Sequence, residues 1–301
     1  MKKNLRNLLF LGLAVLGIWY FAIKQEHYQI SFTTRQPAAI VYNQILEWKG
    51  TKENGISKIV LDQGNQYSEL VQLVHVGDSI FKYHWQFSKA NDSLTQVQVR
   101  ITDEVNGFSQ KIQVPFSNND FVKRSIKNVQ EVGDAMVLNT KKFRVHSIKD
   151  TVFPGGYCAY LTLESTVEKK AATMLYSISD LMGYVKENEL ELQGDPYLEV
   201  IHWNEETSEI RYNFCFPLSK SDSLPASTKV LFKETPSFKA IKAEFNGNYS
   251  ISDNAWYYLM EYAEQNQLTV KNLPIELYLN DPHTSGTPLQ WKANIYLPLV
   301  D

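Results

Sequence analysis

The C-terminal half of this 301-residue sequence contains an internal repeat, which restricts the possible folds more than any other feature. A shift of 78 positions places Leu259-Met260-x-Tyr262 on Leu181-Met182-x-Tyr184. The closing Pro298-Leu299 matches Pro217-Leu218 after a three-residue insertion. Matches in the same order at one offset indicate a duplicated structural unit. The sequence therefore predicts two similar halves within one domain over residues 143–301.

Each half of the repeat reads as two strands, a helix and two further strands, which is a ββαββ unit. In the first half these elements are expected at residues 143–148, 157–165, 168–188, 197–203 and 209–216. In the second half they are expected at residues 228–233, 238–245, 250–265, 274–280 and 290–297. A polar stretch, residues 219–227, would link the halves. The expected fold class is α+β, with an antiparallel sheet in this domain.

Residues 1–24 are predicted to be a membrane anchor. Three basic residues precede the uncharged run Leu8–Ile23, and Lys24 follows it. The run is slightly shorter than the ~20 residues of a typical span, which a snorkelling lysine can extend. A cleaved signal peptide is the alternative, but no small-x-small cleavage site follows the run. We therefore expect a transmembrane helix over residues 7–24 in a bacterial inner membrane, with a cytoplasmic N-terminus and the other domains outside the cytoplasm.

Residues 27–142 read as a separate first domain. A strand at 27–32 and a helix at 37–48 are followed by strand candidates at 55–62, 67–76, 79–88, 93–103 and 110–115. A hairpin turn is expected at Asn91-Asp92. A long helix is expected from 120 to 137, with Asp120 as its N-cap and Phe121, Ile126, Val129 and Val132 on its apolar side.

This order of elements, opened by the stretch Phe32–Tyr42, resembles the START-like (SRPBCC, polyketide cyclase-like) helix-grip fold. The resemblance implies a sheet that grips a long C-terminal helix and an apolar ligand enclosed between them. His75 and His84 lie in predicted strands and are interpreted as structural. Trp48 and Trp85 are interpreted as core or rim aromatic residues, so nothing in this domain marks a reactive centre.

The repeated domain resembles the GyrI-like effector-binding domains in four places: Phe245–Tyr249, Trp256–Leu259, Pro274–Pro282 and Trp291–Leu299. The resemblance implies a concave sheet that binds small molecules, often cationic or aromatic. It also implies an alternative, because some relatives hydrolyse strained electrophilic ligands.

Strand alternation predicts which side chains of this domain share a surface. The polar residues of the last two strands are expected together on the concave surface, with the apolar residues against the helices. By the repeat, Asn213 is the partner of Asn294. Tyr249 is added because the family keeps an aromatic residue at the helix entry, whereas Trp256 and Tyr257 are expected in the core. The candidate ligand-binding residues are Asn294, Tyr296, Glu276, Tyr278, Tyr249 and Asn213.

One of these positions departs from the family pattern. Members commonly end in a Thr-Glu-Ile-Tyr-like run whose acid faces the ligand, whereas this chain has Ala293-Asn294-Ile295-Tyr296. A buried cation needs a paired charge, which an amide does not supply. This argues against tight binding of organic cations at Asn294 unless Glu276 substitutes. It also argues against hydrolysis, which would need an acid for general acid/base catalysis.

Composition and motif content narrow the function classes. A net charge of −3 gives no electrostatic footprint for nucleic acid, and no helix-turn-helix precedes the repeat. The two cysteines and six histidines show no ligand spacing, so neither a metal nor another cofactor is expected. Cys158 and Cys215 would pair in an oxidising compartment or, alternatively, be two small buried residues.

Three functions therefore stay open at the level of the sequence. The favoured one is a membrane-anchored, non-catalytic protein that binds a small hydrophobic, amphipathic or aromatic molecule. The second is a hydrolase of a reactive small molecule that uses Glu276 and a cleft tyrosine. The third is an envelope protein-interaction module whose clefts are filled by its own side chains, such as Trp291.

Overall fold

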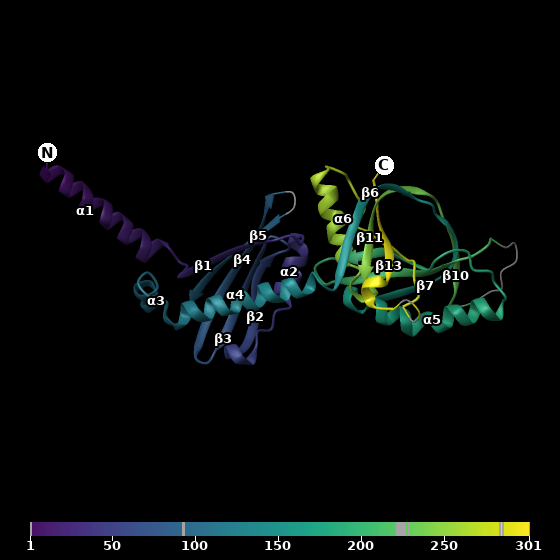
Figure 1. Ribbon diagram of the computed structural model, residues 1–301, viewed down its shortest axis with the longest axis horizontal. Coiled ribbons are helices and arrows are strands. Elements are labelled where there is room, and N and C mark those ends of the chain that lie inside the picture. Colours follow the sequence, from purple (N-terminus) through teal and green to yellow (C-terminus); the bar gives the residue numbers. More distant parts are fainter. Residues whose placement is uncertain are drawn as a thin grey trace. The chain divides into compact units, whose positions relative to one another are not determined.

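The computed structural model describes residues 2–91, 94–220, 227, 229–282, 284 and 286–300. The chain forms two compact units, Met1–Val137 and Leu138–Asp301 (Figure 1). Part of the predicted hairpin turn, Asp92, and most of the predicted linker, residues 221–226, lie outside the described residues.

The N-terminal segment forms the α-helix α1 (Lys2–Ile18) and a π-helical turn η1 (Trp19–Ile23). The hydroxyl of Tyr20 donates to the carbonyl oxygen of Lys111 at 2.9 Å, and Lys111 Nζ donates to the carbonyl oxygen of Phe21 at 2.9 Å. These two bonds tie η1 to the short helix α3 (Gly107–Gln113). The predicted transmembrane helix is not found, because no helix in the described part of the chain is both long and apolar enough to cross a bilayer.

The first unit contains a five-stranded antiparallel sheet in the order β1-β5-β4-β3-β2. Its strands are β1 (Tyr28–Thr34), β2 (Ile56–Asn65), β3 (Glu69–Val76), β4 (Ser79–Asn91) and β5 (Leu94–Asp103). The helix α2 (Ala38–Leu46) and the short turn η2 (Lys52–Asn54) separate β1 from β2, and the long helix α4 (Asp120–Asn139) follows α3. This is the order of elements expected of a helix-grip arrangement.

The core of the first unit lies between α4 and one face of this sheet. Alternate residues of β4, including Tyr83 and Trp85, are buried there beside the other strands. The predicted apolar side of α4 is confirmed, because Phe121, Val129 and Val132 are buried and Ile126 packs against the same cluster. Apolar residues that recur every two positions on the strands and every 3.6 positions on the helix thus pack into the same core.

Two local predictions in the first unit are wrong. Residues 110–115 were expected as a strand, but the chain enters α3 at Gly107. The carboxylate of Asp103 accepts bonds from the N–H groups of Val105 and Asn106 and from Gln110 Nε2, which turns the chain away from the sheet. Asn119, rather than Asp120, caps α4, because its Oδ1 accepts from the N–H of Val122 at 3.0 Å.

The second unit is built on one eight-stranded sheet in the order β10-β7-β9-β8-β12-β13-β11-β6. The first half of the repeat supplies β6 (Phe143–Phe153), β7 (Gly156–Thr166), η3 (Val167–Lys169), α5 (Lys170–Glu187), β8 (Tyr197–Asn204) and β9 (Glu209–Pro217). The second half supplies β10 (Leu231–Thr235), β11 (Phe238–Gly247), η4 (Tyr249–Ile251), α6 (Asn254–Gln265), β12 (Ile275–Tyr278), η5 (Pro288–Gln290) and β13 (Lys292–Pro298). The predicted ββαββ order is confirmed in both halves.

The halves exchange their first strands. The strand β6 pairs with β11 of the other half, and β10 pairs with β7. The turn between β6 and β7 therefore lies close to the turn between β10 and β11. Gly155, in the first turn, has a φ of 72°, and a Cβ at this position would clash with the carbonyl oxygen of Thr235. The exchange joins the halves into one continuous sheet.

The two faces of this sheet differ in what covers them. The first, which we call the helix face, carries the main core and packs against α5 and α6 through Leu181, Trp256 and Leu259. Tyr257 is also buried, as expected. The second, the helix-free face, carries a smaller cluster from seven of the eight strands, made of Phe153, Cys158, Tyr197, Cys215, Ala240, Ile275 and Tyr296.

Candidate ligand-binding site

The pairing of β12 with β13 determines which predicted site residues share a face. Residues directly opposite each other in an antiparallel pair point to the same side of the sheet. Leu277 lies opposite Asn294, whereas Glu276 lies opposite the core residue Ile295. Asn294 and Tyr296 therefore belong to the helix-free face, as predicted. The prediction that Glu276 and Tyr278 join them is wrong, because both lie on the helix face.

Glu276 is completely buried on the helix face. Ser252 Oγ and the hydroxyl of Tyr278 each donate to Glu276 Oε2 at 2.6 Å. The other carboxylate oxygen, Oε1, lies 3.9 Å from Lys170 Nζ. Lys170 Nζ in turn lies 2.6 Å from Asp253 Oδ1. The first residue of α5 and the residue preceding α6 thus form a charge network with Glu276 of β12.

The titration of this network follows from its burial. Burial raises the pKa of Glu276, because the ammonium of Lys170, which lies nearer to Asp253, offsets this effect only in part. Burial by itself would lower the pKa of Lys170, but the carboxylates of Asp253 and Glu276 outweigh it and raise that pKa. Lys170 therefore keeps its proton inside the protein.

Tyr249 also belongs to the helix face. Its hydroxyl donates to the carbonyl oxygen of Lys292 at 2.8 Å, and its ring centroid lies 4.7 Å from that of Tyr278. The centroid of the Trp291 ring lies 5.7 Å from that of Tyr249. Tyr249, Tyr278 and Glu276 are thus brought together, but as an enclosed cluster. Neither the Glu276 carboxyl nor the Tyr278 hydroxyl reaches a molecule placed on the helix-free face.

Three predicted residues, Asn213, Asn294 and Tyr296, lie on the helix-free face. Asn213 lies opposite Glu199, Glu199 opposite Ile275, and Ile275 opposite Tyr296. Asn213 and Tyr296 therefore end one row of side chains across β9, β8, β12 and β13. Asn294 lies in the next row, beside Leu277. The repeat correctly predicted that the two asparagines occupy related places.

The sequence interpretation missed one acid of this face, Glu199. Its Oε2 accepts from Asn213 Nδ2 at 2.9 Å and pairs with Lys233 Nζ. Thr162 Oγ1 donates to Asn213 Oδ1 at 2.9 Å, which fixes the orientation of the amide. The 78-residue shift places Glu199 on Leu277, so the comparison of the halves carried no sign of an acid there.

Aromatic side chains cover the other part of the helix-free face. The centroid of the Phe153 ring, at the end of β6, lies 5.2 Å from the ring centroid of Tyr296, 5.9 Å from that of Tyr197 and 5.1 Å from that of Phe238. Phe153 and Tyr296 are 4% and 7% exposed, so these rings shield each other from solvent. The face thus joins an aromatic cluster to the polar row that holds Asn213 and the ion pair of Glu199 with Lys233.

Both cysteines lie on the helix-free face as free, buried thiols, which confirms the alternative of two small buried residues. The hydroxyl of Tyr197 donates to Cys158 Sγ at 3.2 Å. A hydrogen bond from Cys215 lowers the pKa of Cys158 to about 7, and the hydrogen bond from Tyr197 acts in the same direction. Burial opposes both effects but does not cancel them. Burial raises the pKa of Cys215 well above its ordinary value.

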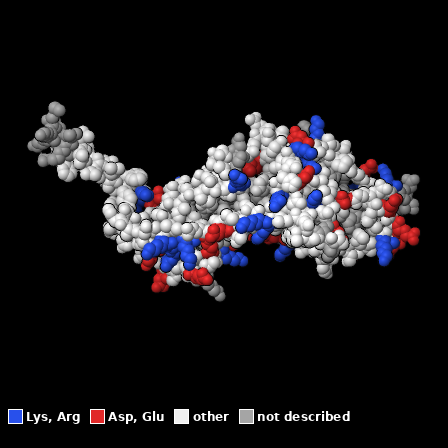
Figure 2. All heavy atoms as spheres, in the orientation of Figure 1, with Lys and Arg blue, Asp and Glu red and all other residues white. Residues whose placement is uncertain are grey.

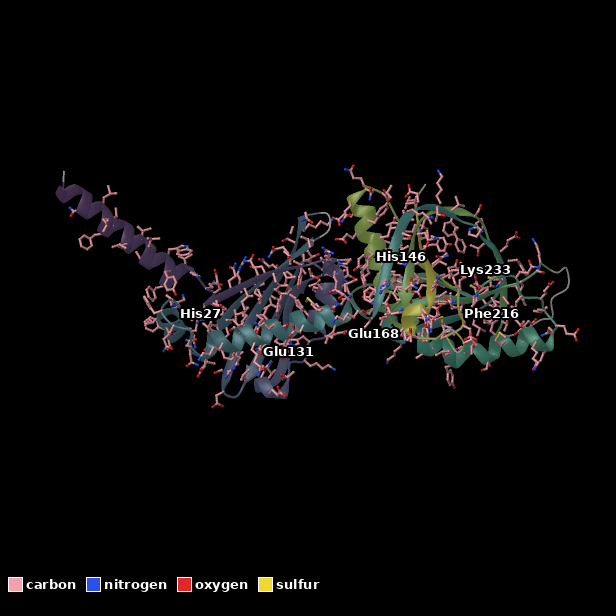
Figure 3. The ribbon with its side chains drawn as sticks, in the orientation of Figure 1. His27, Glu131, His146, Glu168, Phe216 and Lys233 are labelled. Carbon is pink, nitrogen blue, oxygen red and sulfur yellow. The ribbon has the colours of Figure 1, made fainter. Side chains whose placement is uncertain are left out.

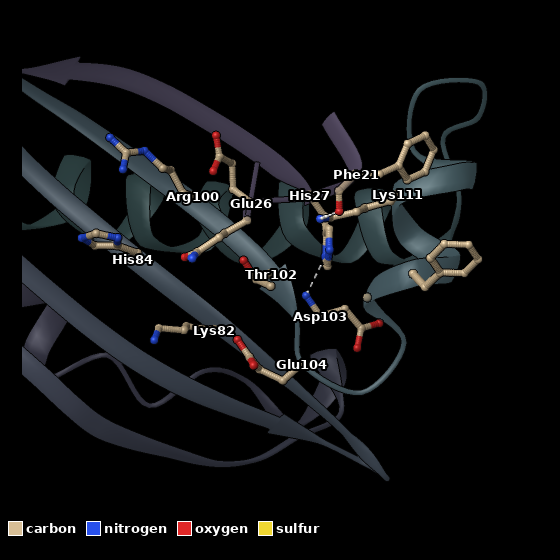
Figure 4. Close-up of a pocket in the computed structure, with 13 residues that line it drawn as sticks. Phe21, Glu26, His27, Lys82, His84, Arg100, Thr102, Asp103, Glu104 and Lys111 are labelled. Carbon is tan, nitrogen blue, oxygen red and sulfur yellow. Dashed lines mark hydrogen bonds between the residues drawn. The ribbon is translucent and has the colours of Figure 1, made fainter. Parts of the chain in front are cut away.

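The first unit has a separate pocket of about 550 Å³ on the sheet face opposite α4 (Figure 4). Its lining mixes charges, with Lys82, Arg100 and Lys111 beside Glu26 and Glu104. It is not the apolar cavity that the START-like resemblance implies, because that cavity would lie between helix and sheet. There, the rings of Tyr83 and Trp85 occupy the interior.

Neither the charges on the face drawn in Figure 2 nor the metal-ligand geometry of the described residues indicates another kind of site. Basic and acidic side chains are interspersed on the side of the molecule drawn in Figure 2. Within the residues that the structure describes, no group of three or more His, Cys, Asp or Glu side chains could hold a metal ion.

The second unit thus has the form of a duplicated α+β module in which, among the described residues, both α5 and α6 cover the same sheet face. Residues 159–300 match the family model of the GyrI-like small molecule binding domain, and the chain contains a domain of this family there. A search of curated proteins finds no match.

Several solved structures are similar to parts of the chain. The C-terminal domain of EcmrR is 18% identical over 53% of this chain and 98% of that chain, with a TM-score of 0.42. SAV2435 bound to tetraphenylphosphonium is 14% identical over 52% and 94%, with a TM-score of 0.36. The di-domain ARO/CYC StfQ from the steffimycin biosynthetic pathway is 9% identical over 91% and 84%, with a TM-score of 0.22.

Proposed function

We propose that the second unit binds a small amphipathic or aromatic molecule on the helix-free face and performs no chemistry on it. The observation that carries this proposal is the composition of that face within a GyrI-like small molecule binding domain. Asn213, Asn294 and Tyr296 offer hydrogen-bonding groups beside a cluster of aromatic rings. Apolar surface with a few placed polar groups is typical of small-molecule sites.

The aromatic cluster determines how a ligand would enter. Phe153 already occupies the apolar part of the face, so a bound aromatic group would take over its contacts with Tyr197 and Tyr296. Trp291, the side chain expected to fill the cleft of an interaction module, instead packs against Tyr249 on the helix face. The side chain that fills the apolar part of the helix-free face is therefore Phe153, at the end of the edge strand β6.

Hydrolysis by Glu276 and a tyrosine receives less support. The two groups do form a 2.6 Å hydrogen bond with Tyr278 as donor. However, Glu276 has no exposed surface, and Tyr278 is only 6% exposed. General acid/base catalysis requires the group to come within hydrogen-bonding reach of the reacting atom.

Thermal denaturation of the full chain with a panel of neutral, anionic and cationic aromatic compounds tests the proposal. A ligand that binds only the folded state adds about 2.7 kcal/mol at 100 times its dissociation constant. The shift should shrink in Asn294→Leu and Tyr296→Ala, each compared with the same variant without ligand. It should persist in Tyr176→Ala, which removes a tyrosine that is 89% exposed on α5. A panel without any saturable shift would contradict the proposal.

The membrane contact through residues 7–24, and the extracytoplasmic location that it would give, stay predictions of the sequence. They are supported by the uncharged run Leu8–Ile23 and by the exposure of its side chains, such as 71% for Leu8 and 62% for Phe10. Carbonate extraction of a membrane fraction tests this contact. Release of the full chain into the supernatant would contradict it.

A further inference from the structure

Glu199 is a carboxylate in the middle of the sheet on the helix-free face. Its strand, β8, is one of the two middle strands of the eight-stranded sheet. Its side chain is 18% exposed, so a molecule on this face would contact it. The second half of the repeat has Leu277 at the matching place, and the amide Asn294 lies opposite Leu277. Of the two positions related by the repeat, 199 and 277, only the first therefore carries an acid.

Lys233 reaches this acid from the edge of the sheet (labelled in Figure 3). It lies on β10, and both β7 and β9 separate β10 from β8 in the sheet order. Its side chain passes over the ring of Tyr160 on β7, with Nζ 5.4 Å from the ring centroid, and ends in an ion pair with Glu199. The lysine thus extends over the very surface on which we place the ligand.

The arrangement of groups around Lys233 Nζ is one that recognises organic cations. A positive group over an aromatic ring and beside a carboxylate gains from the quadrupole of the ring as well as from the opposite charge. Here Tyr160 supplies the ring, Glu199 supplies the charge, and Asn213 donates to the same carboxylate oxygen at 2.9 Å. The cation that fills the position belongs to the chain itself.

We propose that Lys233 is a specificity-determining residue that occupies the cation position of the ligand site and excludes lipophilic cations. This inference rests on the proposed function and narrows its ligand to an uncharged aromatic or amphipathic molecule. A cationic ligand would have to displace the ammonium and leave it partly buried without its counter-ion. Discrimination by such an unpaired or like charge is a general device of selective sites.

Tetraphenylphosphonium, a large apolar cation, is the probe that tests this role. Isothermal titration of the full chain should show no saturable binding to the wild type. Lys233→Met removes the ammonium, keeps the length of the side chain and frees Glu199. This variant should bind the probe at least about tenfold more tightly, as expected for a close charge pair. Adding Glu199→Gln to Lys233→Met should abolish the gain.

Lys229→Met is the matched control, because Lys229 also forms an ion pair, with Asp180 at 3.0 Å, but is 70% exposed. It should leave the absence of binding unchanged. Lys233→Gln provides a second neutral variant, and circular dichroism of each variant checks that it is folded. Equal binding of the probe by the wild type and folded Lys233 variants would overturn the inference, as would a gain that survives Glu199→Gln.

The outcome also separates this inference from the proposed function. If the wild type binds a neutral aromatic compound and the folded Lys233 variants acquire no affinity for the cation, the inference is wrong and the proposed function stands. If neither the wild type nor any variant binds a compound of the panel, both are wrong.

Discussion

The ammonium of Lys170 and the carboxylate of Glu276 lie 3.9 Å apart inside the second unit, and neither side chain has any exposed surface. Lys170 begins α5 in the first half of the repeat, whereas Glu276 lies on β12 in the second half. The contact therefore connects the halves through the main core. It also accounts for the inward orientation of Glu276, since a buried carboxylate needs a nearby charge or hydrogen bonds.

Replacing Lys170 by Met should destabilise the second unit by about 3–5 kcal/mol, the usual result of removing one partner from a buried pair. The carboxylates of Asp253 and Glu276 would lose their shared cation. Adding Glu276→Gln to Lys170→Met should recover part of the loss, because the buried acid is then gone. Urea denaturation of the single and double variants measures both effects as a double-mutant cycle.

The exposed pair formed by Lys229 and Asp180 provides the control for this cycle. Lys229→Met should change the free energy of unfolding by less than about 1 kcal/mol, as exposed pairs usually do. A similarly small loss for Lys170→Met would show that the buried network contributes little to stability.

The same network should make stability depend on pH. The folded pKa of Glu276 is raised above its ordinary value of 4.5, so the folded protein holds this proton more tightly than the unfolded chain. Its contribution is fully present below that ordinary value and is lost as the pH rises through the raised pKa. As the pH rises above about 4.5, the unfolding free energy of the wild type should therefore decrease relative to that of Glu276→Gln. A difference that does not change with pH would contradict the raised pKa.

The sequence predicted the order of the elements better than the composition of the site. Its repeat yielded the ββαββ order, and alternation placed Asn294 and Tyr296 correctly because the opposite side of β13 is wholly apolar. The rule failed on β12, where it took Glu276 for a surface residue. The reason is that its partner, Lys170, belongs to the other half of the repeat and is visible only in the fold. Lys233 was missed likewise, because it reaches Glu199 across two intervening strands.

Removing the ring of Phe153 should open the helix-free face. Phe153→Ala is expected to cost about 3–5 kcal/mol of stability, as for other large-to-small changes in a core. The same change removes the side chain with which a ligand competes, so an aromatic ligand should bind more tightly. Titration with the best neutral compound of the panel measures the gain. Unchanged or weaker binding by a folded Phe153→Ala would place the ligand elsewhere.

Glu131, labelled in Figure 3, holds the segment that follows α2 against α4. Its carboxylate accepts from Trp48 Nε1 at 3.1 Å, from Asn54 Nδ2 at 2.5 Å and from Thr51 Oγ1 at 3.3 Å. Glu131→Ala leaves these donors without their acceptor and should cost about 1–3 kcal/mol. Glu131→Gln keeps one acceptor oxygen and should therefore lower the free energy of unfolding by less than Glu131→Ala does. Urea denaturation followed by tryptophan fluorescence measures both losses. Equal stability of Glu131→Ala and the wild type would contradict this role.

His27 should make the first unit sensitive to acid. Its Nδ1 accepts from the N–H of Asp103 at 3.0 Å, which requires an unprotonated nitrogen (Figure 4). Burial, together with the charge of Lys111, lowers the pKa of His27 below its ordinary value of 6.5. A histidine with a lowered folded pKa contributes stability that is fully present above its ordinary value and is lost as the pH falls through the window below it.

Between about pH 7.5 and about pH 5, a range that spans the ordinary histidine pKa, the melting temperature of the wild type should therefore fall by more than that of His27→Gln. The amide oxygen of the glutamine accepts a similar hydrogen bond but does not titrate. His202→Gln is the matched control, because His202 is exposed on β8 and its replacement should leave the acid sensitivity of the wild type intact. If His27→Gln loses as much stability in acid as the wild type, groups other than His27 determine the acid response.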